Sequence, residues 1–227
     1  MKLAAILLVS FMFCAGRALA AQPPACPPYT KAIVIDFKTQ TPAPTYNRNL
    51  NVNGIRNLFL TRGQSNNGPH SRALGITAIE TMLSLRASSR LVPQQNGYCV
   101  YLTSVDADFG WQKQQVFIAS ELKQGSCGYN AVLDHENQHV AINRETVAQY
   151  APRIRARIEE SLRAQKPVFT QNTGSTTDAI LEGIKNQAGS VMDQFGSTMS
   201  QRHGVIDTAS NYSATSALCS DWGDTPK

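Results

Sequence analysis

The sequence predicts an α+β fold, in which a small antiparallel sheet packs against a long helix, an additional helix lies near the C-terminus, and disulfides staple the chain. Segments rich in β-branched and aromatic residues lie upstream of Gly125 and have the length of strands. From Tyr129 onward no glycine occurs until Gly174, and apolar residues recur there at helical intervals. Four cysteines follow residue 20, an even number that favours disulfide pairing.

The N-terminus has the pattern of a cleaved signal peptide. An apolar run over residues 3–15 precedes Ala18-Leu19-Ala20, which has the small-x-small form of a cleavage site. A membrane anchor is the alternative, but the run is well short of the roughly 20 residues that span a bilayer. We therefore expect residues 1–20 to be removed and the protein to be secreted or periplasmic, without stable membrane insertion.

The remaining chain has a length that suits one domain. The formal net charge is +5, which falls by two to +3 once Lys2 and Arg17 leave with the signal peptide. These charges form no dense basic run, so nucleic-acid binding gains no support. We expect a single domain over 21–227, with the sheet and long helix in 29–165, a linker in 166–176, and the C-terminal helix and tail in 177–227.

Four segments are predicted strands because of their composition or their alternation of apolar and polar residues. They are residues 31–37, 75–86, 98–105 and 114–122. The last two, joined by 106–110, are expected to form an antiparallel hairpin or neighbouring pair. Residues 49–60 fit neither the strand nor the helix period and stay unassigned.

Two helical stretches follow. In the first, Pro152 is expected to kink or break the helix. In the second, Ser175 to Asp178 has the form of a capping box, and the helix is expected to end near His203-Gly204. One apolar stripe is expected to face the core along this helix, formed by Ile180, Ile184, Ala188, Val191, Phe195 and Met199.

Cys26, Cys99, Cys127 and Cys219 are the four cysteines that remain after cleavage. Zinc ligation is an alternative to disulfides, but no two of them have the close C-x-x-C spacing that structural zinc sites usually show. Two disulfides are therefore expected. Of the three possible pairings, Cys99–Cys127 together with Cys26–Cys219 is favoured.

The motif His135-Glu136-Asn137-Gln138-His139 carries the main chemical signal. Two histidines four residues apart lie about 40° apart on one helix face, so both imidazoles can reach one ion. A catalytic Zn²⁺ takes three protein ligands and keeps a position for water, from which Glu136 can take a proton. His135 and His139 are thus predicted zinc ligands, and Glu136 the predicted catalytic base.

The alternative is that these residues are a solvated helix face. The chain has only four histidines in 227 residues, so a chance match to this motif is rare. Apolar residues around the motif favour a helix held in a core. The strand directly upstream, over 116–122, is of the kind whose edge can hold an extended peptide.

The third metal ligand is left open by the sequence. Glu145 lies where some such motifs place a third histidine, but without a glycine at Ile142 an unbroken helix carries it about 9 Å beyond His139. Glu159 and Glu160 lie about twenty residues after His139. Either could reach the metal only if Pro152 breaks the helix, and Glu159 is ranked marginally first. If Pro152 only kinks it, a distant residue is required, with Glu182, His203 and Asp207 as candidates.

A side chain that stabilises an oxyanion is also expected in such a site. Four residues are available for this role, and the sequence does not select among them: Tyr129, Tyr150, Tyr212 and His203.

The segment 125–140 resembles an uncharacterised family of secreted bacterial proteins that are described as zinc-dependent proteases. The likeness extends to 68–77 upstream and, more faintly, to 206–212 and Cys219. It implies a periplasmic or secreted location and the roles given above for His135, Glu136 and His139. The family description itself derives from the motif, and it names no substrate.

The function predicted from these features is that of a secreted or periplasmic zinc-dependent hydrolase. It is expected to be a metallopeptidase that acts on a peptide or protein through zinc-bound water. One alternative is a non-catalytic periplasmic protein that binds metal or interacts with the cell envelope, and another is an inactive domain held by disulfides. The oligomeric state is not indicated by the sequence.

Overall fold

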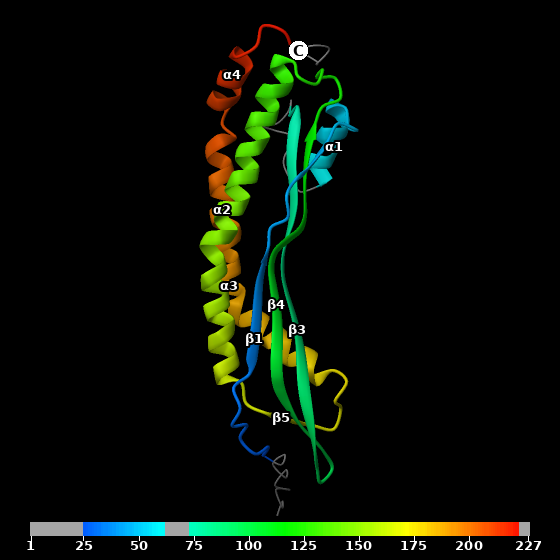
Figure 1. Ribbon diagram of the computed structural model, residues 1–227, viewed down its shortest axis with the longest axis vertical. Helices are drawn as coiled ribbons and strands as arrows, with labels where there is room; N and C mark the ends of the chain where they lie inside the picture. The colour runs from blue at the N-terminus through cyan, green and yellow to red at the C-terminus, as the bar shows by residue number, and fades with distance from the viewer. Residues whose placement is uncertain (1–24, 62–72, 223–227) are drawn as a thin grey trace, which may run out of the picture.

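The structure is a computed structural model that describes residues 25–61 and 73–222. The molecule is elongated, with a long β-hairpin on one side and two long helices on the other (Figure 1). The predicted α+β class is confirmed. The expected signal peptide, residues 1–20, lies outside the described residues.

The sheet is mixed rather than antiparallel, which corrects the prediction. β3 and β4 form an antiparallel hairpin that turns at Asn96, whose φ of 83° is one that asparagine tolerates. β1 and β2 pair in parallel with the opposite edge of β4, because the chain crosses over before it enters β4. The five strands of the described residues are β1 (Val34–Gln40), β2 (Thr45–Asn47), β3 (Gly75–Gln94), β4 (Gly97–Ile118) and β5 (Val168–Thr170).

β4 is one continuous strand, so the prediction of two strands joined at 106–110 is wrong. The polar residues in the middle of β4 do not form a turn, because they find partners on neighbouring strands. Asp108 accepts hydrogen bonds from Gln40 of β1 (3.1 Å) and Arg86 of β3 (2.7 Å), which hold the pKa of that carboxyl below its usual range. Gly110 has a φ of 133°, and an added Cβ would collide with the Gln40 carbonyl.

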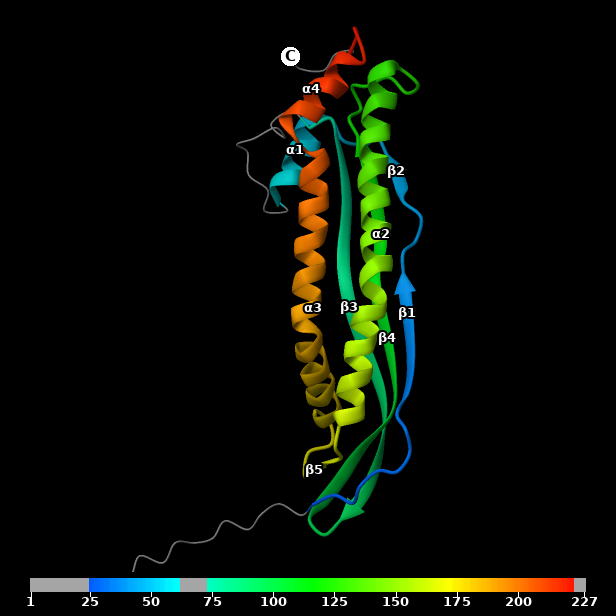
Figure 2. The same ribbon diagram turned by 90° about the vertical axis from the view of Figure 1, so that its left-hand side faces the viewer.

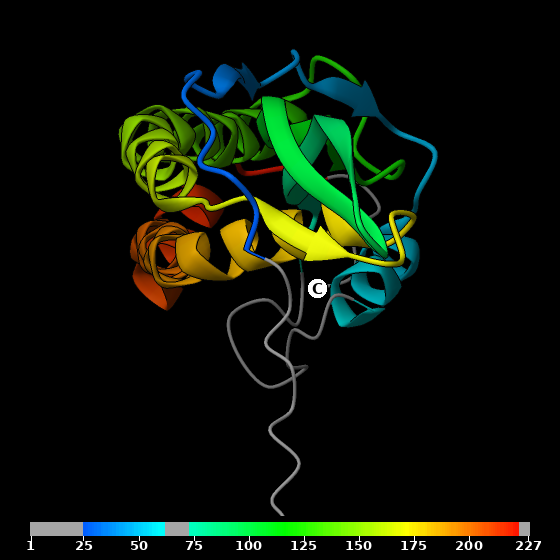
Figure 3. The ribbon, with the colours of Figure 1, turned by 90° about the horizontal axis from the view of Figure 1, so that it is seen from below.

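The helices α2 (Cys127–Ala164) and α3 (Thr176–Ile206) lie side by side and cover one face of the sheet (Figures 2 and 3). α2 continues through Pro152, so the predicted break does not occur. Val147 and Ile154, on either side of that proline, are both buried in the same core as β4. The free energy gained by this burial offsets the loss of the backbone hydrogen bond that proline cannot make.

α3 has the predicted apolar stripe, with Ile184, Ala188 and Phe195 buried. The predicted capping box is not formed, because the Ser175 side chain makes no cap hydrogen bond. The helix also ends later than predicted, at Ile206, and Asp207 is its C-cap. Asp207 therefore lies where the chain leaves α3 for α4 (Ala209–Ala217).

α1 (Val52–Thr61) occupies the segment that the sequence left unassigned. Its Ile55 is buried against Ala78 and Phe117, which project from the sheet face opposite α2. On the α2 side, Val116 packs with Val132. The sheet is thus covered on both faces at this end of the molecule.

Two disulfides are present, as expected, but the predicted pairing is wrong. Cys26 is bonded to Cys99, and Cys127 to Cys219. Cys99 lies at the hairpin end of β4 and Cys127 follows the other end, about 60 Å away at the rise of an extended strand. Disulfides of this kind are typical of proteins that mature in an oxidising compartment. No helix in 25–61 or 73–222 is long and apolar enough to cross a membrane.

Candidate metal centre

His135 and His139 lie on α2, as predicted, with their rings nearly perpendicular and their Nε2 atoms close together. α2 begins at Ser126, whose side chain accepts a hydrogen bond from the Tyr129 backbone N–H. The motif therefore follows a capped first turn, in regular helix. The two Nε2 atoms are 3.2 Å apart. Together with the Glu136 carboxylate they form a group whose ligand atoms all lie within 4.8 Å of one another and could hold a metal ion.

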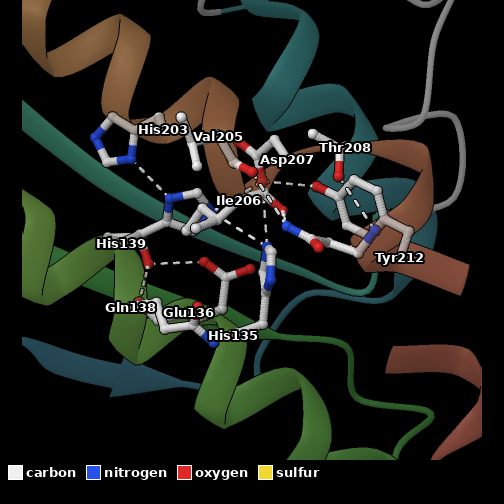
Figure 4. A network of polar contacts seen from close by, with 12 residues as sticks. His135, Glu136, Gln138, His139, His203, Val205, Ile206, Asp207, Thr208 and Tyr212 are labelled. Atoms are coloured by element: carbon white, nitrogen blue, oxygen red, sulfur yellow. Dashed lines mark hydrogen bonds and ion pairs between the residues drawn. The ribbon is translucent and has the colours of Figure 1, made fainter. Parts of the chain in front are cut away.

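Asp207 reaches the two histidines from the C-cap of α3. Its Oδ1 is 3.2 Å from His135 Nε2 and 3.1 Å from His139 Nε2, although 72 positions separate Asp207 from His135. These two nitrogens and one oxygen thus form a nearly equilateral triangle (Figure 4). Asp207 was among the open candidates of the sequence, and the structure places it at the pair.

The carboxylates of α2 and the start of α3 that the sequence considered lie elsewhere. Glu159, which was ranked first, and Glu160 form ion pairs with Arg155 and Arg157 on the α2 surface. Because α2 is continuous, Glu159 lies about 30 Å along the axis from His139. Glu145 is exposed on α2, and Glu182 is exposed on α3 beside Lys185.

Glu136 is almost completely buried, with 4% of its surface exposed. Thr77 of β3 donates a hydrogen bond of 2.7 Å to Glu136 Oε2. Burial raises the pKa of the Glu136 carboxyl, an effect that His139, Thr77 and His135 partly offset. At Gly75 an added Cβ would lie 2.7 Å from Glu136 Oε1, so only glycine leaves room for this carboxylate.

The sequence analysis gave no role to Gly75 or Thr77. The available signal was the resemblance over 68–77, which includes both residues. Periodicity alone identified this segment only as a strand.

His203 contacts His139 at Nδ1, whereas the contacts of His139 with His135 and Asp207 are at Nε2. Its Nδ1 lies 2.7 Å from His139 Nδ1, and its Nε2 lies 2.9 Å from Asn143 Oδ1. Because Asn143 Oδ1 can only accept, Nε2 of His203 carries the proton and its Nδ1 accepts from His139. A neutral His139 that donates from Nδ1 would have its lone pair on Nε2, whereas a protonated His139 donates from both nitrogens.

Burial and neighbouring charges shift the pKa values of these side chains in different directions. Burial, together with the neighbouring His139, lowers the pKa of His203 to about 4, which keeps this ring neutral. Burial also opposes charge on His139, but Asp207 and Glu136 outweigh it and raise the His139 pKa. Asp207 is itself buried, yet hydrogen bonds from His135, His139 and Tyr212 hold its pKa well below the usual range.

Tyr212 of α4 is the tyrosine that the structure brings to the site. Its hydroxyl donates a hydrogen bond of 2.9 Å to Asp207 Oδ1, and burial next to that carboxylate raises the Tyr212 pKa. Tyr150 instead bonds Thr198 between α2 and α3, and Tyr129 lies under Arg48. The disulfide Cys127–Cys219 ties the tail after α4 to the start of α2.

A cavity of about 530 Å³ opens beside the centre. Glu136, His139, Asp207 and Tyr212 line one part of it, and most of the rest is lined by residues of β3 and α3, together with Phe59 of α1. The strand upstream of α2 does not offer the free edge that was predicted, because β4 pairs with β2 on one side and β3 on the other. β3, not β4, borders the cavity.

Comparisons with protein-family models, with curated proteins and with solved structures found no match to this chain. The resemblance drawn from the sequence is therefore untested. Among the described residues, His135, Glu136 and His139 form a group that could bind a metal ion.

Proposed function

We propose that the protein is a zinc-dependent hydrolase that cleaves peptide bonds. The observation that carries this proposal is the convergence of His135 Nε2, His139 Nε2 and Asp207 Oδ1 at 3.1–3.2 Å, next to a buried glutamate at a cavity. His135, His139 and Asp207 would hold the ion. Glu136 would act as the base.

The spacing of the donors fits zinc. In a tetrahedral site with bonds of about 2.0–2.1 Å, neighbouring ligand atoms lie about 3.3 Å apart. The three observed separations of 3.1–3.2 Å match this value. Two imidazole nitrogens and one carboxylate also form the usual ligand number of a catalytic zinc site, which leaves one position open.

Glu136 has the position of a base rather than of a fourth ligand. Thr77 holds its Oε2, and the cavity reaches the same carboxylate. A bound Zn²⁺ supplies a Lewis acid that lowers the pKa of a coordinated water toward about 7. The Glu136 carboxylate would take a proton from that water and return it to the leaving amine.

A metal-binding protein without catalysis is the competing function, and it shares the same ligands. It would require Glu136 to close the site as a fourth ligand, a possibility that the 4.8 Å grouping alone leaves open. We favour the catalytic function because the hydrogen bond from Thr77 already engages the Glu136 carboxylate and because Glu136 lines the cavity.

The mature protein is expected to contain close to one zinc per chain after purification without chelators. A ligand that binds only the folded state stabilises it, so removal of the metal should lower the melting temperature, and re-addition of zinc should restore it. Metal analysis measures the zinc content and thermal unfolding the melting temperature, and mass spectrometry of a digested peptide mixture detects the expected cleavage. The hypothesis fails if no transition metal is present and none is taken up.

Replacing His203 should weaken metal binding without removing a ligand. His203→Leu deletes the acceptor of the His139 Nδ1 proton, and losses of such supporting residues typically lower metal affinity by about 10- to 100-fold. His203→Gln retains an acceptor oxygen and should recover part of the affinity. Competition with a chromogenic chelator measures the zinc affinity of both variants. Wild-type affinity in His203→Leu would exclude a role of the His139–His203 hydrogen bond in metal binding.

A further inference from the structure

The short helix α4 lies beside two of the three proposed metal ligands. Tyr212 of α4 donates a hydrogen bond of 2.9 Å to Asp207 Oδ1, and its ring centroid is 5.4 Å from that of His135 (Figure 4). Further along the helix, Ala214 and Thr215 line a second cavity of about 260 Å³, whose wall also includes His135. The position of α4 therefore bears directly on the geometry of the metal centre.

α4 has little buried surface that could fix this position. None of its residues is buried, and only Tyr212 and Thr215 are partly covered. The hydrophobic effect therefore contributes little to holding the helix in place. At its start, the Asn211 side chain donates hydrogen bonds of 3.1 Å to the carbonyls of Val205 and Ile206. Exposed hydrogen bonds stabilise a contact only modestly, because water competes for both partners.

The far end of α4 is fixed by a covalent link. Cys219, which is 8% exposed, is bonded to Cys127, the first residue of α2, although 92 positions separate them. Trp222 reinforces this attachment, since its indole N–H donates to the Cys219 carbonyl (3.0 Å) and its ring lies against Gly128. His135 lies only about 12 Å along α2 from Cys127. The disulfide thus joins α4 to the helix that carries the two histidines.

We infer that Tyr212 is a positioning residue for Asp207, and that the Cys127–Cys219 disulfide controls it by holding α4 over the metal centre. This inference rests on the proposed function and concerns the regulation of the same site. With the disulfide formed, the Tyr212 hydroxyl holds the Asp207 carboxylate with Oδ1 toward both histidines. With the disulfide reduced, α4 turns about residues 207–208, and Asp207 exchanges the Tyr212 hydroxyl for water. Reduction therefore weakens metal binding.

The reductant is a dithiol, and its attack has a preferred sulfur. Cys127 is exposed whereas Cys219 is buried, so a thiolate attacks Sγ of Cys127 and releases Sγ of Cys219. The second thiol of the reductant then displaces Cys127 from the mixed disulfide. The dithiol is oxidised to a disulfide, and the two cysteines take up two electrons and two protons to become thiols.

The test compares the zinc affinity of two double variants by chelator competition. Cys127→Ser/Cys219→Ser removes the link at α4, and Cys26→Ser/Cys99→Ser, the matched control, removes the disulfide at the hairpin end of β4. The first variant should bind zinc at least about 10-fold more weakly than the wild type, as expected when support for a ligand is lost. The control should bind zinc as the wild type does. Wild-type affinity in the first variant, or an equal loss in the control, overturns the inference.

Tyr212→Phe separates positioning of the ligand from a general loosening of the site. In the wild-type background, loss of the hydroxyl should lower the zinc affinity about 10-fold. In the Cys127→Ser/Cys219→Ser background it should have no further effect, because the hydroxyl no longer reaches Asp207 there. Equal losses in both backgrounds contradict the coupling of Tyr212 to the disulfide.

Treatment of the wild type with dithiothreitol tests the reduction itself. The freed thiols are alkylated so that they cannot bind zinc, and the reductant is removed before the affinity is measured. The wild type should then bind zinc as weakly as Cys127→Ser/Cys219→Ser, which the same treatment should leave unchanged. A wild type whose Cys127–Cys219 bond resists reduction, or that keeps its affinity after reduction, overturns the inference.

Hydrogen exchange shows whether the double variant is folded. In Cys127→Ser/Cys219→Ser, amide protection should fall in α4 and persist in α2 and α3. Loss of protection in all three helices overturns the inference, because the disulfide would then support the fold rather than the position of α4. A wild type that contains no zinc and takes none up overturns the proposed function instead, whatever the variants do.

Discussion

The Glu136→Gln variant is expected to keep its metal ion and to lose about 10²- to 10⁴-fold in kcat, the range that a general base contributes. Glutamine has the shape of glutamate and can keep the hydrogen bond to Thr77, so the packing against Gly75 should persist. It cannot accept and return a proton. The buried carboxylate, with its raised pKa, is the group that the reaction would lose.

Glu145→Gln is the matched control, because Glu145 is exposed on the same helix. It should have the kcat and the metal content of the wild type. Metal analysis and steady-state kinetics on one cleaved peptide distinguish the outcomes. A wild-type kcat in Glu136→Gln would show that Glu136 is not the base. Loss of the metal in this variant would indicate that Glu136 is a ligand and would favour the non-catalytic function.

The Asp207→Asn variant should lose most of its metal affinity. The amide keeps the size of the carboxylate. It lacks the negative charge that would offset the positive charge of the ion held with His135 and His139. We expect a loss of at least about 100-fold, the upper end of what residues that only support ligands contribute. Zinc affinity by chelator competition is the direct measurement.

Asp193→Asn, an exposed position on α3, is the control and should bind zinc as the wild type does. Thermal unfolding without metal should show that Asp207→Asn is folded, since Asp207 caps α3 through its backbone rather than its carboxylate. An unchanged affinity in Asp207→Asn would mean that the third ligand lies elsewhere. If Glu136→Gln alone lost the metal, the roles of the two carboxylates would be exchanged.

The spacing of residues along the sequence predicted the features that depend only on the repeat of a single helix or strand. The spacing of His135 and His139 places both rings on one helix face, and the apolar stripe of α3 predicts its buried face. Composition was misleading at 106–110, where polar residues in a strand resemble a turn. Their partners, Gln40 and Arg86, belong to other strands, so no local signal reveals that Asp108 is paired.

The sequence by itself determined that a helix carries two imidazoles one turn apart, with a carboxylate on the residue after the first, because those positions depend only on the helical repeat. The tertiary structure alone decided that Asp207 and His203 join them and which cysteines pair. From His139 to the end of α2 the helix rises about 38 Å, and α3 returns about 45 Å in the opposite direction. Residues 203–207 therefore come level with the histidines only because α2 continues through Pro152 and α3 packs antiparallel beside it.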